Sequence, residues 1–176
     1  MKKRFLCALT ALLLIATPAL AEGGLISALA TPTPEPVGME LEFDGLRLTL
    51  PAGLEPLEGD MLEAYEAAVQ SDYPETANTI LAAVDPQSGA ALLLAEIESE
   101  VDCLDAARDA AESLIGDPDM ASEKTCGASR CASFSCAIEE QIFHMYYLSD
   151  GERLLIVSAS GLEQSVIEDL LAGFQF

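Results

Sequence analysis

The sequence predicts an α+β fold in which helices pack on an antiparallel β-sheet. Asp44-Gly45 and Asp150-Gly151 each lie between two apolar runs, and an Asp-Gly pair is typical of a two-residue hairpin turn because both positions tolerate positive φ. Between these hairpins, apolar residues recur at the three- and four-residue spacing of amphipathic helices. The predicted order of the elements is therefore ββ-α-ββ-α-βββ-α.

The first predicted elements are a hairpin and a helix. Apolar and polar residues alternate over 39–43 and 46–50, as in strands that are buried on one face. Pro51 ends the second strand because it cannot donate to a ladder. Asp60 is the predicted N-cap of a helix that runs to about Gln70.

The middle of the chain predicts two buried strands and a second helix. The segment 78–100 reads as two nearly all-apolar strands joined by a turn at 86–89, and such strands are expected at the centre of a sheet. Asp102 is the predicted N-cap of the helix, since its carboxylate can accept from a backbone N–H of the first turn. Gly116 is expected to end this helix.

The last third of the chain predicts three strands and a closing helix. The strands are expected at about 129–137, 139–148 and 152–159, and the helix at 162–171. The chain contains no Trp and only 6 Phe, so the core is expected to consist mainly of Leu, Ile, Val and Ala.

The N-terminus has the pattern of a secretory signal peptide. A positive segment at 2–4 precedes an apolar run at 5–16, and Ala19-Leu20-Ala21 is a small-x-small cleavage site. The apolar run is shorter than the roughly 20 residues that a membrane span needs. We therefore expect cleavage after Ala21 and a secreted or extracytoplasmic envelope protein that meets the membrane only during export.

The remaining chain divides into a tether and one domain. Residues 22–37 contain prolines at positions 32, 34 and 36, which favour an extended tether. Residues 38–176 are expected to form a single α+β domain, which is the usual number for this length.

The charge of the chain excludes one class of partner. All 30 acidic residues follow position 21, whereas three of the 8 basic residues precede it, so the mature chain carries a formal charge of −25. Such a chain repels phosphate backbones and anionic lipid surfaces. We expect no nucleic-acid binding.

The four cysteines after the signal peptide, Cys103, Cys126, Cys131 and Cys136, predict disulfides. The chain has no C-x-x-C pair and a single histidine, which disfavours zinc and thiol-redox sites, and an even number of cysteines in an exported protein favours disulfides. On one straight strand, Cys131 and Cys136 would lie about 16 Å apart, whereas bridged Cα atoms lie within about 7 Å. We predict Cys126–Cys131 and Cys103–Cys136. The alternatives are a Cys103–Cys126 bridge, partly free thiols and a metal site.

Candidate surface residues lie on two predicted strands. Glu96, Glu98 and Glu100 share one face of a strand, where they could contact a partner or gather Ca²⁺, and a solvated face explains them equally well. Tyr147, if exposed, could anchor a partner. His144 is expected to face the same way as Ile142 and to be a half-buried structural residue.

Motifs for catalysis and cofactor binding are missing. The sequence contains no G-x-S-x-G, no G-x-G-x-x-G, no Walker loop and no D-x-D-x-D-G calcium loop. We therefore predict no enzymatic activity, no cofactor, no catalytic residue and no bound metal.

Three segments carry a resemblance to a known fold. "DGLRLTLPAGLE" is similar to an opening hairpin that runs into Leu-Pro, "YYLSDGERLLIVSASG" to a long central hairpin, and "VIEDLLAGFQF" to a closing helix with a terminal Phe-containing segment. Together they resemble the PsbP-like α/β/α sandwich, which PsbP, the Ran-binding Mog proteins and DcrB-type envelope lipoproteins share. The resemblance covers about 39–176 and implies a non-enzymatic accessory or binding domain. The alternative fold is cystatin-like, with a curved sheet around a helix.

The sequence thus predicts an exported, non-catalytic binding or accessory domain of the cell envelope or extracellular space, with an unknown protein partner. One alternative is a small exported hydrolase that uses His144 with a nearby serine or carboxylate. The other is a calcium-responsive acidic domain that uses the strand at 96–100.

Overall fold

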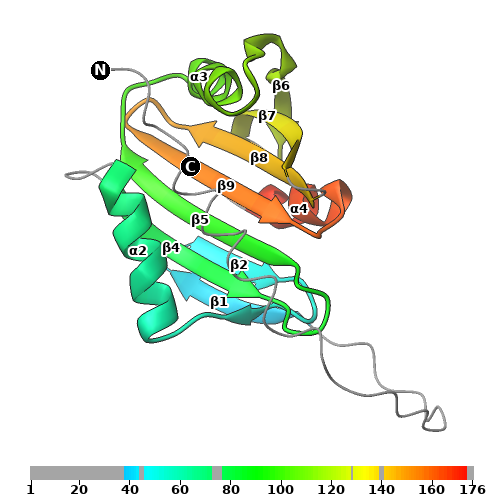
Figure 1. Cartoon of the computed structure of the whole chain (residues 1–176). Helices are drawn as coiled ribbons and strands as arrows, with labels where there is room; N and C mark the ends of the chain where they lie inside the picture. Colours follow the sequence, from blue (N-terminus) through cyan, green and yellow to red (C-terminus); the bar gives the residue numbers. More distant parts are fainter. Residues whose placement is uncertain (1–37, 44–45, 73–76, 128, 139–140, 174–176) are drawn as a thin grey trace, which may run out of the picture.

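Figure 1 shows the computed structural model of the protein, which describes residues 38–43, 46–72, 77–127, 129–138 and 141–173. The predicted signal peptide (1–21), the tether (22–37) and the Asp44-Gly45 turn lie outside the described residues. No helix within these ranges is long and apolar enough to cross a membrane.

Seven strands form one sheet in the order β3-β4-β5-β9-β8-β7-β6. Every neighbouring pair in this sheet is antiparallel. The strands are β3 (Glu55–Pro56), β4 (Ala77–Val84), β5 (Ala91–Glu98), β6 (Ser122–Cys126), β7 (Ser129–Ile138), β8 (Gln141–Ser149) and β9 (Arg153–Ser160). The predicted α+β class is confirmed, and the apolar strand β5 lies near the centre as expected.

The opening hairpin lies apart from this sheet. β1 (Met39–Phe43) and β2 (Leu46–Leu50) pair with each other in a separate antiparallel sheet. The register places Met39 opposite Leu50. The strand pair predicted from the alternation of apolar and polar residues is therefore confirmed.

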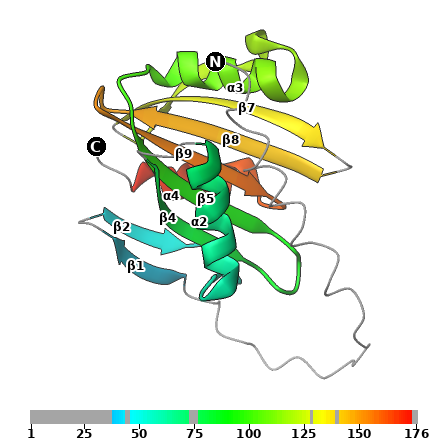
Figure 2. The same cartoon turned by 60° about the vertical axis from the view of Figure 1, so that its left-hand side comes forward.

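Helices cover both faces of the large sheet, as Figure 2 shows. The helices are α2 (Asp60–Asp72), α3 (Cys103–Ile115) and α4 (Gln164–Ala172), with a short 3₁₀ helix η1 (Pro118–Met120) after α3. α2 and α3 lie on one face, whereas α4 and the β1–β2 hairpin lie on the other. The domain thus has three layers, with the sheet in the middle.

Strict alternation along the strands divides the core in two. On β8, Phe143 and Met145 belong to the core on the α2/α3 face, whereas Tyr146 and Leu148 belong to the core on the α4 face. The sheet has a core on each face because successive side chains in a strand point to opposite faces. Because β8 is apolar on both faces, it reads as a continuous hydrophobic run.

The ends of α3 match the sequence signals. The Asp102 side chain accepts a hydrogen bond of 2.9 Å from the backbone N–H of Leu104, which satisfies a donor that the helix itself leaves unpaired. Gly116 has a left-handed backbone with φ 74°, and its N–H donates to the carbonyl of Glu112. A residue with a side chain is strained at such a φ, which explains the glycine at this position.

Two strands and several boundaries differ from the sequence-based expectation. β3 and β6 were not predicted, because β6 ("SEKTC") is an edge strand with little apolar alternation and β3 has only two residues. β5 ends at Glu98, and α4 begins at Gln164 rather than at Leu162. The extra strands lengthen the sheet at its two edges and leave its predicted centre unchanged.

Candidate functional site

A disulfide closes the hairpin between β6 and β7. Cys126 pairs in register with Ser129, and Cys131 lies opposite Lys124, so both cysteines point to the α4 face. Their Cα atoms are 6.0 Å apart and their sulfurs are bonded. The predicted Cys126–Cys131 pairing is confirmed. Because structural disulfides are rare in reducing compartments, it favours an extracytoplasmic location.

The turn of this hairpin packs on the end of α4. Gly127 has a φ of 63°, and a Cβ added to it would lie 2.7 Å from the carbonyl oxygen of Ala172. The turn therefore needs glycine both for its backbone conformation and for its close approach to the helix.

The predicted Cys103–Cys136 bridge is not formed, since both cysteines are buried free thiols. The Asp102 carboxylate lies 3.8 Å from the Arg130 guanidinium, which places the start of α3 at the first residues of β7. Cys136 is six residues further along β7 than Arg130, roughly 20 Å at the rise of a strand. Bridged Cα atoms lie within about 7 Å, so the packing of α3 on β7 keeps this pair apart.

The two free thiols are poorly suited to chemistry. Burial raises the pKa of both thiols, and the neighbouring Asp102 carboxylate raises the pKa of Cys103 further. Both sulfurs are therefore protonated at neutral pH, whereas nucleophilic attack and metal binding require the thiolate. Cys103 and Cys136 are core residues of the α2/α3 face.

The three glutamates of the predicted cation surface do not form a cluster. Glu96 is half-buried and lies 3.7 Å from the Arg153 guanidinium, whereas Glu98 is the exposed last residue of β5. Glu100 lies beyond the end of the strand, so only two of the three carboxylates share its face. Within the described ranges, no three His, Cys, Asp or Glu side chains are placed to hold a metal ion.

Tyr147, a candidate partner anchor only if exposed, is buried. It is 1% exposed and stacks on Phe134 with ring centroids 6.3 Å apart. The alternation along β8 explains this, because Tyr147 shares the α2/α3 face with Phe143 and Met145. It contributes to the core and offers no surface to a partner.

A polar cluster lies on the α4 face, and we call it the α4-face cluster. Its members are Lys124, Ser135, His144, Tyr146, Gln164 and Glu168. Ser135 and His144 are opposite each other on β7 and β8, with Oγ and Nδ1 2.7 Å apart. Burial and the positive charge of Lys124 lower the pKa of His144, against a smaller opposing effect of Glu168. The imidazole is therefore neutral at pH 7.

Glu168 of α4 is the acceptor at the centre of this cluster. Its Oε1 accepts hydrogen bonds from Gln164 Nε2 at 2.8 Å, Lys124 Nζ at 3.0 Å and Tyr146 OH at 3.4 Å. The Lys124 hydrogen bond is the main cause of the lowered pKa of Glu168. Burial and the Glu168 charge raise the pKa of Tyr146 to about 12. The cluster ties α4 to β6 and β8 through charge-assisted hydrogen bonds.

The cluster contains two of the three groups of a serine-hydrolase triad, a serine and a histidine. A neutral histidine beside a serine hydroxyl can act as a general base. In the described part of the chain, however, no carboxylate hydrogen-bonds to His144, and Glu168 is occupied by its three donors. The pair therefore lacks the third group that orients the base in a serine triad.

Sequence reasoning identified His144 but not the rest of this cluster. Lys124 and Glu168 are 44 positions apart in the sequence, so no spacing signal connects them. Their meeting depends on β6, an edge strand whose composition does not predict a strand. The predicted orientation of His144, on the same face as Tyr146, could be read from the alternation alone.

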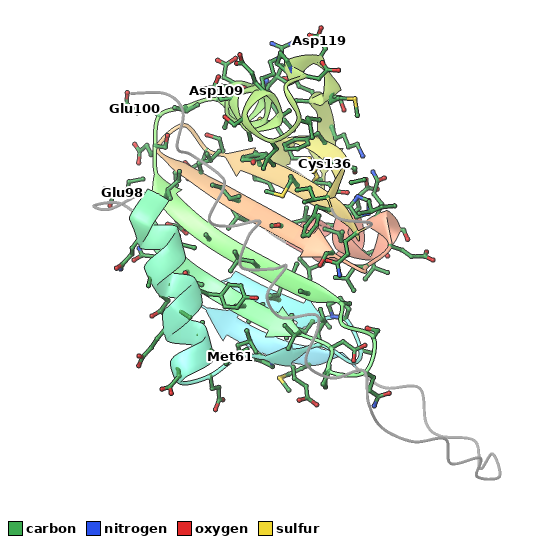
Figure 3. The ribbon with its side chains drawn as sticks, in the orientation of Figure 1. Met61, Glu98, Glu100, Asp109, Asp119 and Cys136 are labelled. Atoms are coloured by element: carbon green, nitrogen blue, oxygen red, sulfur yellow. A yellow bond between two sulfur atoms is a disulfide. The ribbon has the colours of Figure 1, made fainter. Side chains whose placement is uncertain are left out.

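A row of exposed carboxylates follows α3, and we call it the α3 acidic surface. Its members are Glu100, Asp105, Asp109, Glu112, Asp117 and Asp119. Figure 3 shows Glu100, Asp109 and Asp119 along α3 and the segments at its two ends. None of the ion pairs found among the described residues involves a member of this row. Arg108 is the basic residue of α3 and is also exposed, so the six carboxylates leave this surface net negative and open to solvent.

A groove of about 370 Å³ lies between the end of β2 and α4. Thr49, Leu50, Val166 and Leu170 line it, and Asp169 is the ionisable residue among those that line it. It offers space for a small apolar group but brings together no titratable groups that could act on one another.

Comparisons with known proteins include two distant matches to solved structures. No protein-family model matches the sequence, and no curated protein matches it. Among solved structures, a protein of Bacteroides thetaiotaomicron is 13% identical with a TM-score of 0.45, over 72% of this chain and 43% of that one. LpqN of Mycobacterium tuberculosis, described as involved in cell envelope biogenesis, is 14% identical with a TM-score of 0.39, over 77% and 79% of the two chains.

These matches carry no argument about function. This chain spans less than half of the Bacteroides thetaiotaomicron protein, and both TM-scores are low. Neither match is described as PsbP-like, so that resemblance stays a prediction. The α+β class itself follows from the sheet and helices of this structure.

Proposed function

We propose that this protein is an exported, non-catalytic binding or accessory domain that recognises a positively charged protein through the α3 acidic surface. The disulfide supports a location outside the cytosol. The observation that carries the proposal is the row of exposed carboxylates on α3 and its flanking segments, none of which takes part in an ion pair found among the described residues.

The charge pattern on α3 suits a basic partner. Asp105, Asp109 and Glu112 follow the four- and three-residue spacing of one helix face, and Arg108 beside them offsets only one of these three charges. A cationic partner relieves the repulsion that remains. Ile115 and Met120 at the end of the same row are 36% and 49% exposed. Exposed apolar side chains among carboxylates provide the anchors that an interface needs in addition to charge.

The test is an affinity capture from cell-envelope and culture fractions with a charge-neutralised variant. Asp105→Asn, Asp109→Asn and Glu112→Gln together remove three charges from α3. The matched control removes three exposed charges elsewhere, with Glu55→Gln, Glu58→Gln and Glu63→Gln. We expect the same basic protein to be recovered with the wild type and the control and to be lost with the α3 variant.

Two results would count against the proposal. No enriched partner across several growth conditions would remove its basis. Equal loss of the partner in both variants would show that the total charge, and not this surface, controls binding.

A second candidate function rests on one distance. Ser135 Oγ lies 2.7 Å from His144 Nδ1, as a serine hydrolase would require of its nucleophile and base. A broad esterase, peptidase and glycosidase screen, followed by labelling with a fluorophosphonate, tests this function. Activity that survives both His144→Ala and Ser135→Ala would exclude this pair as its source.

A further inference from the structure

The groove between β2 and α4 has an apolar lining and the size of a small-molecule site. Its volume of about 370 Å³ lies within the range of about 300–1,000 Å³ that is typical of such sites. Leu50 and Leu170 are 0% and 7% exposed, and Val166 is half-buried. An apolar body in the groove would therefore meet hydrocarbon from both β2 and α4.

Two glycines of the lining help to keep this space open. Gly38 lies so close to β2 that an added Cβ would overlap the carbonyl oxygen of Leu50. Gly173 is the C-cap of α4 and has a φ of −78° and a ψ of −15°, a right-handed helical conformation that any residue adopts. The backbone does not require glycine at position 173, so what the missing side chain provides there is room in the groove.

The charge at the groove is negative. Asp169 is the ionisable residue of the lining, is exposed, and takes part in none of the ion pairs found among the described residues. The groove also lies at the last turn of α4, where the helix dipole places a partial negative charge and no basic residue offsets it. The two charges add, so this end of the groove favours a cation.

We propose that the groove binds a small cationic amphiphile, a molecule with one ammonium group on an apolar chain. The apolar chain contacts Leu50, Val166 and Leu170, and the ammonium group lies at Asp169 beside the C-terminal end of α4. The same carboxylate repels an anionic head and gives a neutral head no ion pair. The groove is on the opposite face of the sheet from α3, so this site is independent of the α3 acidic surface and of the proposed function (Figure 2).

The test compares three molecules with the same hydrocarbon chain and different heads, hexylamine, hexanol and hexanoate. Each is titrated into the wild-type protein at pH 7, where the amine is protonated, and backbone amide shifts are recorded by NMR. We expect saturable shifts centred on Leu50, Val166 and Leu170. The Kd of hexylamine should be about fivefold below that of hexanol, the combined scale of an exposed ion pair and a helix end, and hexanoate should bind most weakly. Hexylamine that binds no more tightly than hexanol, or shifts centred elsewhere, overturns the proposal.

Two charge variants locate the preference for the amine. Asp169→Asn should raise the Kd of hexylamine close to that of hexanol and leave the Kd of hexanol unchanged. Glu163→Gln is the matched control, because Glu163 is also exposed and lies at the other end of α4. Equal weakening of hexylamine in both variants would assign the preference to the total charge of the chain and overturn the proposal.

A variant that fills the groove tests the apolar contact. Gly173→Leu adds a side chain to the lining where the backbone permits one, and its Tm shows whether it folds like the wild type. Hexylamine and hexanol should both lose most of their binding to the folded variant. Unchanged Kd values would place the two molecules outside the groove and overturn the proposal.

A shortened chain tests the other occupant of the groove. Residues 174–176 follow Gly173 and lie outside the described residues. A Kd of hexylamine that is unchanged when these three residues are deleted supports the proposal. Binding of hexylamine that appears only after this deletion would assign the groove to the end of the chain itself and overturn the proposal.

Discussion

At the scale of single residues, Glu168 determines the state of the α4-face cluster. It accepts from a lysine, a glutamine and a tyrosine that come from three different elements. Its lowered pKa means that the folded state favours the charged carboxylate, so folding is linked to pH through this residue. The side chains of Glu168 and Lys124 are 41% and 32% exposed, so solvent screens much of the attraction.

Glu168→Gln should destabilise the fold at neutral pH by at most about 1 kcal/mol, the upper range for exposed pairs. A group with a lowered folded pKa stabilises above its ordinary pKa of 4.5, and this contribution is lost as the pH falls through the folded value. The Tm values of the wild type and of Glu168→Gln, measured between pH 7 and pH 3, should therefore converge at the acid end. Asp169→Asn, a change at the adjacent position on α4, is the control and should follow the wild type. A Tm difference between the wild type and Glu168→Gln that is the same at every pH would contradict a stabilising charge on Glu168.

His144 gives a second prediction at this scale. It is the only histidine in the chain, so its ring-proton signals in an NMR titration can be assigned without a variant. Burial and Lys124 should place its pKa below the ordinary 6.5. Because protonation then favours the unfolded chain, stability should fall as the pH drops from 6.5 through the folded pKa. A pKa at or above 6.5 would show that Glu168 outweighs burial.

At the scale of elements, the β6–β7 hairpin connects the edge of the sheet to α4. Its disulfide closes a short loop, and its turn glycine touches the last residue of the helix. The two features act on different states of the hairpin. The disulfide reduces the number of conformations that the unfolded chain can adopt, whereas the glycine permits the close contact with α4 in the folded state.

Gly127→Ala should destabilise more than Gly116→Ala. Both glycines have positive φ, 63° and 74°, so both changes introduce the strain of a left-handed residue, about 1–2 kcal/mol. Only at Gly127 would the new Cβ meet α4, since nothing lies within 4 Å of the corresponding position at Gly116. Urea unfolding of the two variants measures the difference. Equal losses would mean that the turn does not press on the helix.

The disulfide should contribute about 2 kcal/mol, the loop-entropy scale for a short loop. Adding a reductant should lower the Tm of the wild type and of the double variant Cys103→Ala and Cys136→Ala by the same amount. The mass of the purified domain should be about 2 Da below that of the reduced chain, the two hydrogens lost in one bridge. A difference of about 4 Da would show that Cys103 and Cys136 are also bridged.

At the scale of the whole molecule, the formal charge of −22 opposes compaction. Raising the salt concentration from about 0.01 M to 0.15 M shortens the screening length from about 30 Å to about 8 Å. Salt also weakens the ion pairs, but these are exposed or partly exposed and contribute little. The Tm of the domain should therefore rise with added sodium chloride. A Tm that falls would mean that attractive pairs dominate.

How much the sequence predicted depends on the range of the interaction. The β1–β2 pair, the caps of α3 and the Cys126–Cys131 bridge each depend on residues close in sequence, and all three were predicted. The burial of Tyr147 depends on which helix covers which face, and the separation of Cys103 from Cys136 depends on where α3 begins on β7. Alternation tells which side chains share a face but not what covers that face, so these features required the structure.

The position of β9 has a consequence for the export that we propose. Among the described residues, β9 is the last strand in sequence and yet the central one, with β3, β4 and β5 on one side and β8, β7 and β6 on the other. A chain that has emerged only as far as Ser149 therefore has two unjoined half-sheets, each with an open central edge. Stable folding requires residues 153–160 to be present, so the domain can close only when nearly the whole chain is available. For the export that we propose, a late central strand makes folding the final event after release.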